Sequence, residues 1–182
     1  LLALFGLFAD LGLRRRTSLL ALLIFASTNG SVLPVGWLAN RNALIAGFFL
    51  VLAVRAVVRA SAAKQPLAPK AVALSLLAGA LACAGKESGV VAFALCALWL
   101  AIAARRAESG EARRAAVLGA SAHVVAALAY LLLLFGLGYG TRCVFYATPW
   151  DTPLRYGANV VTLLGAGTLR LVAPISLDMG HY

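Results

Sequence analysis

Lys86 and Glu87 are the residue pair most able to do chemistry, because they interrupt an apolar stretch, residues 71–104, between Gly85 and Gly89. Ionisable side chains at membrane depth are costly and commonly mark a binding site or a pathway. The alternative is a hairpin turn at which the two side chains reach water and pair, a contribution of about 0 to 1 kcal/mol. The sequence leaves both interpretations open. A nucleotide-binding P-loop is excluded, since no Ser or Thr directly follows Lys86.

Arg41 is the second candidate, and it follows Trp37 and Asn40 where a helix is expected to begin. A guanidinium group can hold a phosphate through two parallel hydrogen bonds. The simpler alternative is interfacial: Trp37 belongs to an aromatic belt, and Arg41 reaches the lipid headgroups. Both interpretations stay open, and the binding site is supported by the prediction that Arg41 and Lys86 lie on the same membrane face.

An aromatic segment, residues 139–156, is the third candidate and includes Trp150, Asp151 and Arg155. The apolar face of a sugar ring can stack on an aromatic side chain, and a carboxylate can accept hydrogen bonds from its hydroxyls. The segment therefore suits a glycan or a lipid-linked sugar. An aromatic belt around an outer loop remains the alternative, since Trp and Tyr are enriched at membrane interfaces.

The remaining residues of reactive types, among them His and Cys, are expected to have packing roles rather than catalytic ones. We expect His123 to be a hydrogen-bonded residue between helices, and Cys83 and Cys96 to be inert core thiols. The pair Asp178 and His181 is too sparse for a metal site. No Ser-His-Asp arrangement, H-E-x-x-H motif or paired carboxylate is recognisable in the sequence.

The composition places these candidates in a bilayer. The chain has 182 residues, of which 63% are hydrophobic and 12% are charged, whereas about a quarter of the residues of a soluble domain are charged. The net charge of +10 is divided among the gaps between apolar runs, which disfavours a nucleic-acid-binding face. The fold class predicted is all-α, a polytopic transmembrane helix bundle.

Three basic clusters, within residues 14–16, 55–70 and 105–114, set the predicted topology. Residues 17–54 and 71–104 each form a hairpin, 115–137 crosses outward and 157–173 returns. The bundle therefore has about six spans plus a truncated span at residues 1–13. By the positive-inside rule the clusters are cytoplasmic, and Arg41 and Lys86 lie outside. We expect one transmembrane domain over 1–182, a fragment of a longer chain.

The basic residues also suggest a source, because thirteen are Arg and three are Lys in a chain rich in Ala and Leu. This usage is typical of GC-rich bacterial coding sequences. The expected location is a bacterial inner membrane.

Residues 35–44, VGWLANRNAL, and 84–91, AGKESGVV, together resemble membrane glycosyltransferases of the C type. The group that they resemble most includes bacterial protein-mannosyltransferase-like enzymes and relatives fused to tetratricopeptide repeats. The resemblance covers most of residues 1–160. It implies transfer of a sugar from a polyprenyl-phosphate donor to a protein, lipid or glycan on the extracytoplasmic face.

The resemblance also implies roles for the candidates. Arg41 and Lys86 would neutralise the donor phosphate, Glu87 would orient Lys86, and Trp37 and Asn40 would contribute to the substrate site. Cations held in a low-dielectric site stabilise a leaving phosphate as its charge develops. The acidic catalytic residue is expected upstream of residue 1, so that the fragment is expected to be inactive alone. A divalent metal in the full-length enzyme stays open.

Two other classes remain as alternatives. In a transporter or flippase, Lys86, Glu87 and His123 would line a pathway between helices. In a non-catalytic scaffold, Arg41, Lys86 and Glu87 would face lipid headgroups instead of one another.

Overall fold

The computed structural model describes residues 1–27, 41–62, 67–138 and 153–172, and these residues form helices joined by short turns without any strand. The predicted all-α bundle is confirmed. The elements in chain order are α1 (Leu2–Asp10), α2 (Arg15–Ser27), α4 (Arg41–Ala62), α5 (Pro69–Gly85), the 3-10 turn η2 (Glu87–Val90), α6 (Val91–Arg106), α7 (Gly110–Gly136) and α8 (Pro153–Val172).

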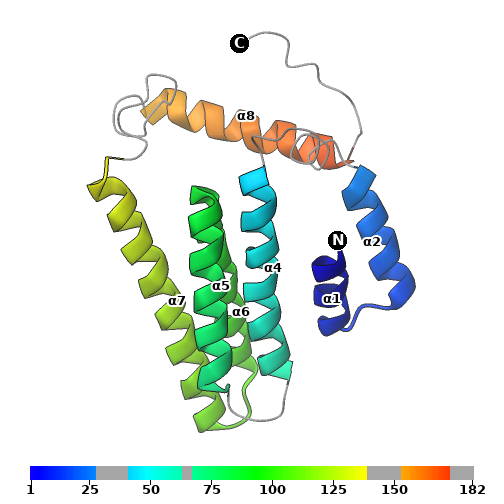
Figure 1. Ribbon diagram of the computed structural model, residues 1–182, viewed down its shortest axis with the longest axis vertical. Helices are drawn as coiled ribbons and strands as arrows, with labels where there is room; N and C mark the ends of the chain where they lie inside the picture. Colours follow the sequence, from blue (N-terminus) through cyan, green and yellow to red (C-terminus); the bar gives the residue numbers. More distant parts are fainter. Residues whose placement is uncertain (28–40, 63–66, 139–152, 173–182) are drawn as a thin grey trace.

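Helices α4 to α7 run up and down beside one another and form the bundle, with α1 and α2 placed along one side of α4 (Figure 1). Local sequence signals fix the helix starts at one end of this bundle. Pro69 occupies the first turn of α5, where its missing N–H costs no hydrogen bond. Ser109 caps α7, since its Oγ accepts a hydrogen bond from the N–H of Ala112 at 3.1 Å.

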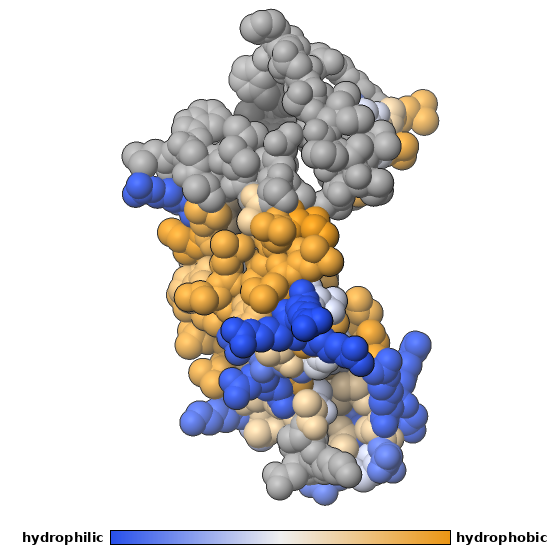
Figure 2. Space-filling view, turned by 90° about the vertical axis from the view of Figure 1, so that its right-hand side faces the viewer, coloured by the Kyte–Doolittle hydropathy of each residue, from blue (hydrophilic) through white to orange (hydrophobic). Residues whose placement is uncertain are grey.

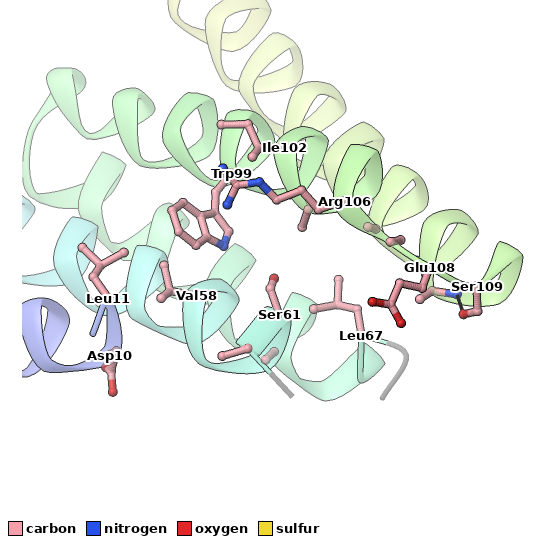
Figure 3. Close-up of a pocket in the computed structure, with 16 residues that line it drawn as sticks. Asp10, Leu11, Val58, Ser61, Leu67, Trp99, Ile102, Arg106, Glu108 and Ser109 are labelled. Atoms are coloured by element: carbon pink, nitrogen blue, oxygen red, sulfur yellow. Dashed lines mark hydrogen bonds between the residues drawn. The ribbon is translucent and has the colours of Figure 1, made fainter. Parts of the chain in front are cut away.

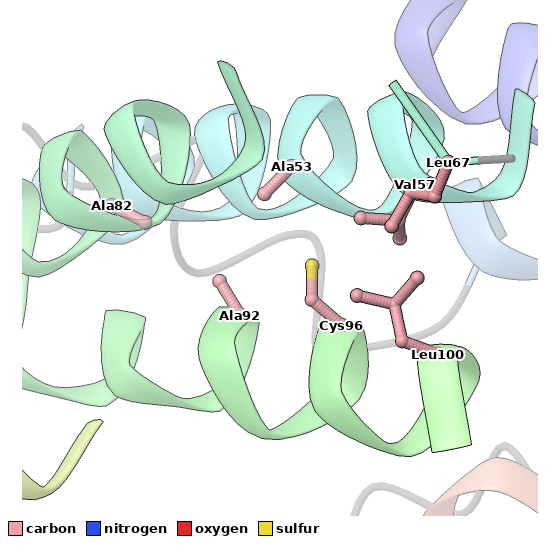
Figure 4. Close-up of a cluster of buried hydrophobic side chains, with 7 residues drawn as sticks. All are labelled: Ala53, Val57, Leu67, Ala82, Ala92, Cys96 and Leu100. Carbon is pink, nitrogen blue, oxygen red and sulfur yellow. The ribbon is translucent and has the colours of Figure 1, made fainter. Parts of the chain in front are cut away.

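Small side chains form much of the core between α4, α5 and α6 and allow the helices to approach closely. Figure 4 shows Ala53 and Val57 of α4 facing Cys96 and Leu100 of α6. The remaining members of this buried cluster are Leu67, Ala82 and Ala92. All members of this cluster are at most 8% exposed, so the bundle interior is closed by direct packing.

Large apolar side chains cover the outside of the bundle, as expected for a lipid-facing surface. In Figure 2 a broad hydrophobic surface lies above a region in which hydrophilic side chains gather. Three helical stretches within the described ranges are long and apolar enough to span a membrane: Arg41–Ala62, Glu87–Arg106 and Gly110–Gly136. In the last of these, 11% of the most apolar window is buried in the protein. The chain is an integral membrane protein.

Within the described ranges, these three helices compare with the six spans that the sequence predicts for the whole chain. Helix α2 has 13 residues, about 20 Å against a hydrocarbon core of about 30 Å. Helix α5 has 17 residues, about 26 Å, and is below the length of the other three, although it runs alongside α4 from one end of the bundle to the other (Figure 1). Helix α8 lies across the end of the bundle instead of returning along it (Figure 1). Its polar residues, among them Asn159 and Arg170, lower its hydropathy below that of a span.

The helix that ends the hairpin predicted over residues 17–54 is longer than expected, because Arg55 and Arg59 of the second basic cluster lie on helix α4. Helix α4 continues to Ala62. The described parts of all three clusters nevertheless lie toward the same end of the bundle, where α4 and α6 end and α5 and α7 begin (Figure 1). We call this the basic end, and the end at which α4 begins and η2 lies the opposite end.

Candidate functional site

The turn between α5 and α6 contains Lys86 and Glu87 at the opposite end. Lys86 leaves the helix in an extended conformation, φ −160° and ψ 146°. Its N–H donates to the carbonyl of Ala82 at 3.0 Å, and its carbonyl accepts from the N–H of Gly89 at 2.8 Å. The Lys86 residue is half-buried and Glu87 is exposed. The predicted break is therefore a short hairpin turn at the end of the bundle.

Gly89 keeps this turn compact by lying against the last turn of α5. A Cβ atom at Gly89 would collide with the backbone of Ala82 and Cys83. Since these are backbone atoms, a rotamer change in a flexible side chain cannot relieve the collision. Gly89 is thus required for the backbone conformation of the turn that contains Lys86 and Glu87.

Gly85 brings the same turn against α4. A Cβ at Gly85 would lie 3.1 Å from the backbone nitrogen of Ala46 and 3.3 Å from Cγ2 of Ile45. Ala46 follows Arg41 by five residues, about 7.5 Å along the helix axis. Arg41 is exposed at the first position of α4. The structure therefore places Arg41 and Lys86 at the same end of the bundle.

The three charged candidates share this end without direct pairing. Within the described residues, no hydrogen bond or ion pair joins Arg41, Lys86 and Glu87. The hairpin turn of the simpler interpretation is present, whereas the direct pairing of Lys86 with Glu87 is not seen in this part of the structure.

The other predicted site residues are Trp37, Asn40, Trp150, Asp151 and Arg155. Trp37, Asn40, Trp150 and Asp151 lie outside the described residues, as does the side chain of Arg155, whose backbone belongs to α8.

His123 is a buried residue of the bundle interior, as the sequence predicts. It is 0% exposed, and its Nδ1 lies 2.8 Å from the carbonyl oxygen of Gly119. A carbonyl can only accept, so Nδ1 carries the proton and Nε2 is free to accept from Ser75 Oγ at 2.9 Å. The ring is held between α7 and α5 with its tilted neighbour Phe93. This is a packing role.

The two described cysteines, Cys83 and Cys96, are buried and free, in agreement with the prediction of core thiols. In the described ranges, no three His, Cys, Asp or Glu side chains gather closely enough to hold a metal ion.

Sequence reasoning missed an ion pair between α1 and α4. Arg55 Nε donates to Asp10 Oδ2 at 2.7 Å, and Arg59 Nε lies 3.7 Å from Oδ1 of the same carboxylate. The side chains of Asp10 and Arg55 are 16% and 25% exposed. Gly6 leaves room for the Arg55 guanidinium, which a Cβ would meet at 2.5 Å. The available signal was that Asp10 is the single acidic residue before Glu87.

A cavity of about 660 Å³ opens beside this ion pair at the basic end. Figure 3 shows side chains from α1, α4, α6 and the α6–α7 turn around it. Its polar lining includes Asp10, Ser61, Trp99, Arg106 and Glu108. Charges of both signs therefore border the cavity. The indole Nε1 of Trp99 is buried without an acceptor among the described residues.

Comparisons with known proteins give no relative for this chain: no protein-family model matches it, and neither a curated protein nor a solved structure shows significant similarity.

Proposed function

We propose that this chain is part of an integral membrane glycosyltransferase that takes a sugar from a polyprenyl-phosphate donor and transfers it to a protein, lipid or glycan. The proposal places donor binding at the opposite end, with Arg41 and Lys86 holding the phosphate and Glu87 orienting Lys86. The observation that carries it is the close approach of Gly85 to Ala46, which brings the start of α4 beside the α5–α6 turn.

The charge distribution supports the orientation that this reaction needs. The described residues of the basic clusters gather at the other end of the bundle, and the positive-inside rule assigns that end to the cytoplasm. The proposed phosphate site then faces the extracytoplasmic side of the membrane. A bacterial inner membrane is the proposed location, following the Arg-rich composition.

In this proposal Arg41 and Lys86 contribute to the reaction through electrostatic stabilisation. When the glycosidic bond to the phosphate breaks, negative charge develops on the leaving phosphate oxygens, and nearby cations stabilise it. An Arg guanidinium adds a two-point hydrogen bond, and a Lys ammonium adds a mobile point charge. The proposal assigns proton transfer to an acidic residue upstream of residue 1, and Trp37, Asn40, Trp150, Asp151 and Arg155 to the substrate site.

The transporter alternative finds less support in the geometry. Lys86 and Glu87 lie in a turn at the end of the bundle, whereas a transport pathway requires polar groups between the helices near the membrane midplane. His123, which would line such a pathway, is enclosed and hydrogen-bonded.

The experiment is photo-crosslinking of the purified chain with a polyprenyl phosphate that carries a photoreactive group in its prenyl tail. We expect Lys86→Gln to weaken binding about tenfold, because a charge-assisted hydrogen bond to phosphate contributes roughly 1.5–3 kcal/mol. Lys70→Gln is the matched control, since Lys70 is an exposed lysine at the basic end. Equal crosslinking of wild type and both variants would overturn the proposed site.

A further inference from the structure

The groove between α6 and α7 is a second surface with a distinct character. It has a volume of about 650 Å³ and is separate from the cavity that contains Trp99. Buried Ala97 and Ala104 contribute to its floor, and exposed Leu98, Val117 and Val125 to its walls. The groove is thus lined mainly by apolar side chains and is open to the lipid side of the bundle.

Two arginines border one end of this groove. Arg105 is in the last turn of α6 and Arg113 is in the first turns of α7, and both are exposed. Neither makes an ion pair with a described residue. No Asp or Glu is among the residues that line the groove, whereas Asp10 and Glu108 border the neighbouring cavity. The charge at the mouth of the groove therefore favours an anion.

The length of the groove matches one leaflet of a bilayer. Its lining extends from Arg105 to Ala97 on α6 and from Arg113 to Val125 on α7, about 12 Å and about 18 Å along the helix axes. Half of a hydrocarbon core is about 15 Å. An acyl chain that enters at the arginines would end near the membrane midplane.

We propose that this groove binds an anionic phospholipid of the leaflet at the basic end. The phosphate accepts hydrogen bonds from Arg105 and Arg113, and one acyl chain lies along the alanines of α6 and α7. Basic pockets between membrane helices bind anionic headgroups by this combination of charge and apolar contact. The site is independent of the proposed donor site, which lies at the other end of the bundle.

The test is native mass spectrometry of the purified full chain in detergent with phosphatidylglycerol or phosphatidylcholine. We expect phosphatidylglycerol to bind about tenfold more tightly than phosphatidylcholine. The double variant Arg105→Gln/Arg113→Gln should lose most of that preference, because each arginine contributes a charge-assisted hydrogen bond. The control Arg106→Gln/Arg114→Gln removes two exposed arginines from the same helix turns that do not line the groove, and it should keep the preference.

The acyl part of the site is tested separately. Ala101→Leu should fill the groove and weaken phosphatidylglycerol binding severalfold, whereas Ala94→Leu, an exposed alanine of α6 outside the groove, should not. Three results would overturn the proposal: equal losses in the two double arginine variants, equal losses in the two alanine variants, or displacement of the lipid by an equimolar amount of inorganic phosphate. None of them affects the binding of polyprenyl phosphate at Lys86, so the two proposals fail independently.

Discussion

Ser75 on α5 and His123 on α7 are joined by a buried 2.9 Å hydrogen bond between Ser75 Oγ and His123 Nε2. Both residues are 0% exposed. Ser75 Oγ also lies 2.8 Å from the carbonyl oxygen of Val72, so the single hydroxyl proton is shared between two acceptors. The pair fixes the register of α5 against α7 in a region where the surrounding contacts are apolar.

The first prediction concerns this pair. We expect Ser75→Ala to lower the free energy of unfolding by about 1–2 kcal/mol, because His123 Nε2 loses its buried partner. The measurement is denaturant unfolding of the detergent-solubilised protein. Ser18→Ala is the matched control: Ser18 is also buried, but its Oγ donates to the carbonyl oxygen of Arg14, which directly precedes its own helix. Equal losses in the two variants would contradict an interhelical role.

The second prediction concerns the turn that presents Lys86. Gly89→Ala should destabilise the protein by about 1–3 kcal/mol, because the added methyl group meets the backbone of Ala82 and the turn must move. Gly47→Ala has open space around it within α4 and should stabilise by up to about 1 kcal/mol. Thermal unfolding in detergent measures both. A Gly89→Ala protein as stable as wild type would show that the turn tolerates a shift.

The third prediction concerns the attachment of α1. Asp10→Asn should weaken the docking of α1 on α4 by about 1–2 kcal/mol, since Arg55 remains partly buried without its carboxylate. Limited proteolysis after residues Arg14–Arg16 should then become faster. Arg59→Gln, at a 67% exposed side chain 3.7 Å from Asp10, should change the rate little. A rate unchanged by Asp10→Asn would contradict the structural role of the pair.

The fourth prediction tests the topology. In a Cys143→Ser background, Glu87→Cys should react with a membrane-impermeant maleimide from the extracytoplasmic side, and Lys70→Cys only after permeabilisation. Cys83 and Cys96 are buried and should stay unmodified. Labelling of both introduced cysteines from one side would contradict the placement of the two helix ends on opposite membrane faces.

The part of the fold that could be predicted consists of the helix ends at which polar residues interrupt an apolar run. The hairpin at residues 85–89 could be predicted because polar residues interrupt an apolar run, and a chain in lipid must keep its backbone hydrogen bonds satisfied by ending one helix and starting another. The helix at residues 110–136 was predictable for the same reason. The packing role of His123 followed from its isolation in an apolar run.

The remaining differences come from contacts between distant residues. The ion pair of Arg55 with Asp10 could not be predicted, since the two residues are 45 positions apart in the sequence. Ser75 could not be identified as the partner of His123, since the two are 48 residues apart. The direction of α8 depends on how it meets the end of the bundle. The number of apolar residues in 157–173 does not predict this orientation.

The central claim is that Arg41 and Lys86 act on one phosphate, and a double-mutant cycle for polyprenyl-phosphate binding tests it most directly. The cycle compares Arg41→Gln, Lys86→Gln and the double variant with wild type in the purified chain. If both cations bind the same phosphate, the losses are coupled and deviate from additivity by about 0.5 kcal/mol or more. Strictly additive losses, or no loss in either single variant, would contradict a shared phosphate site at this end of the bundle.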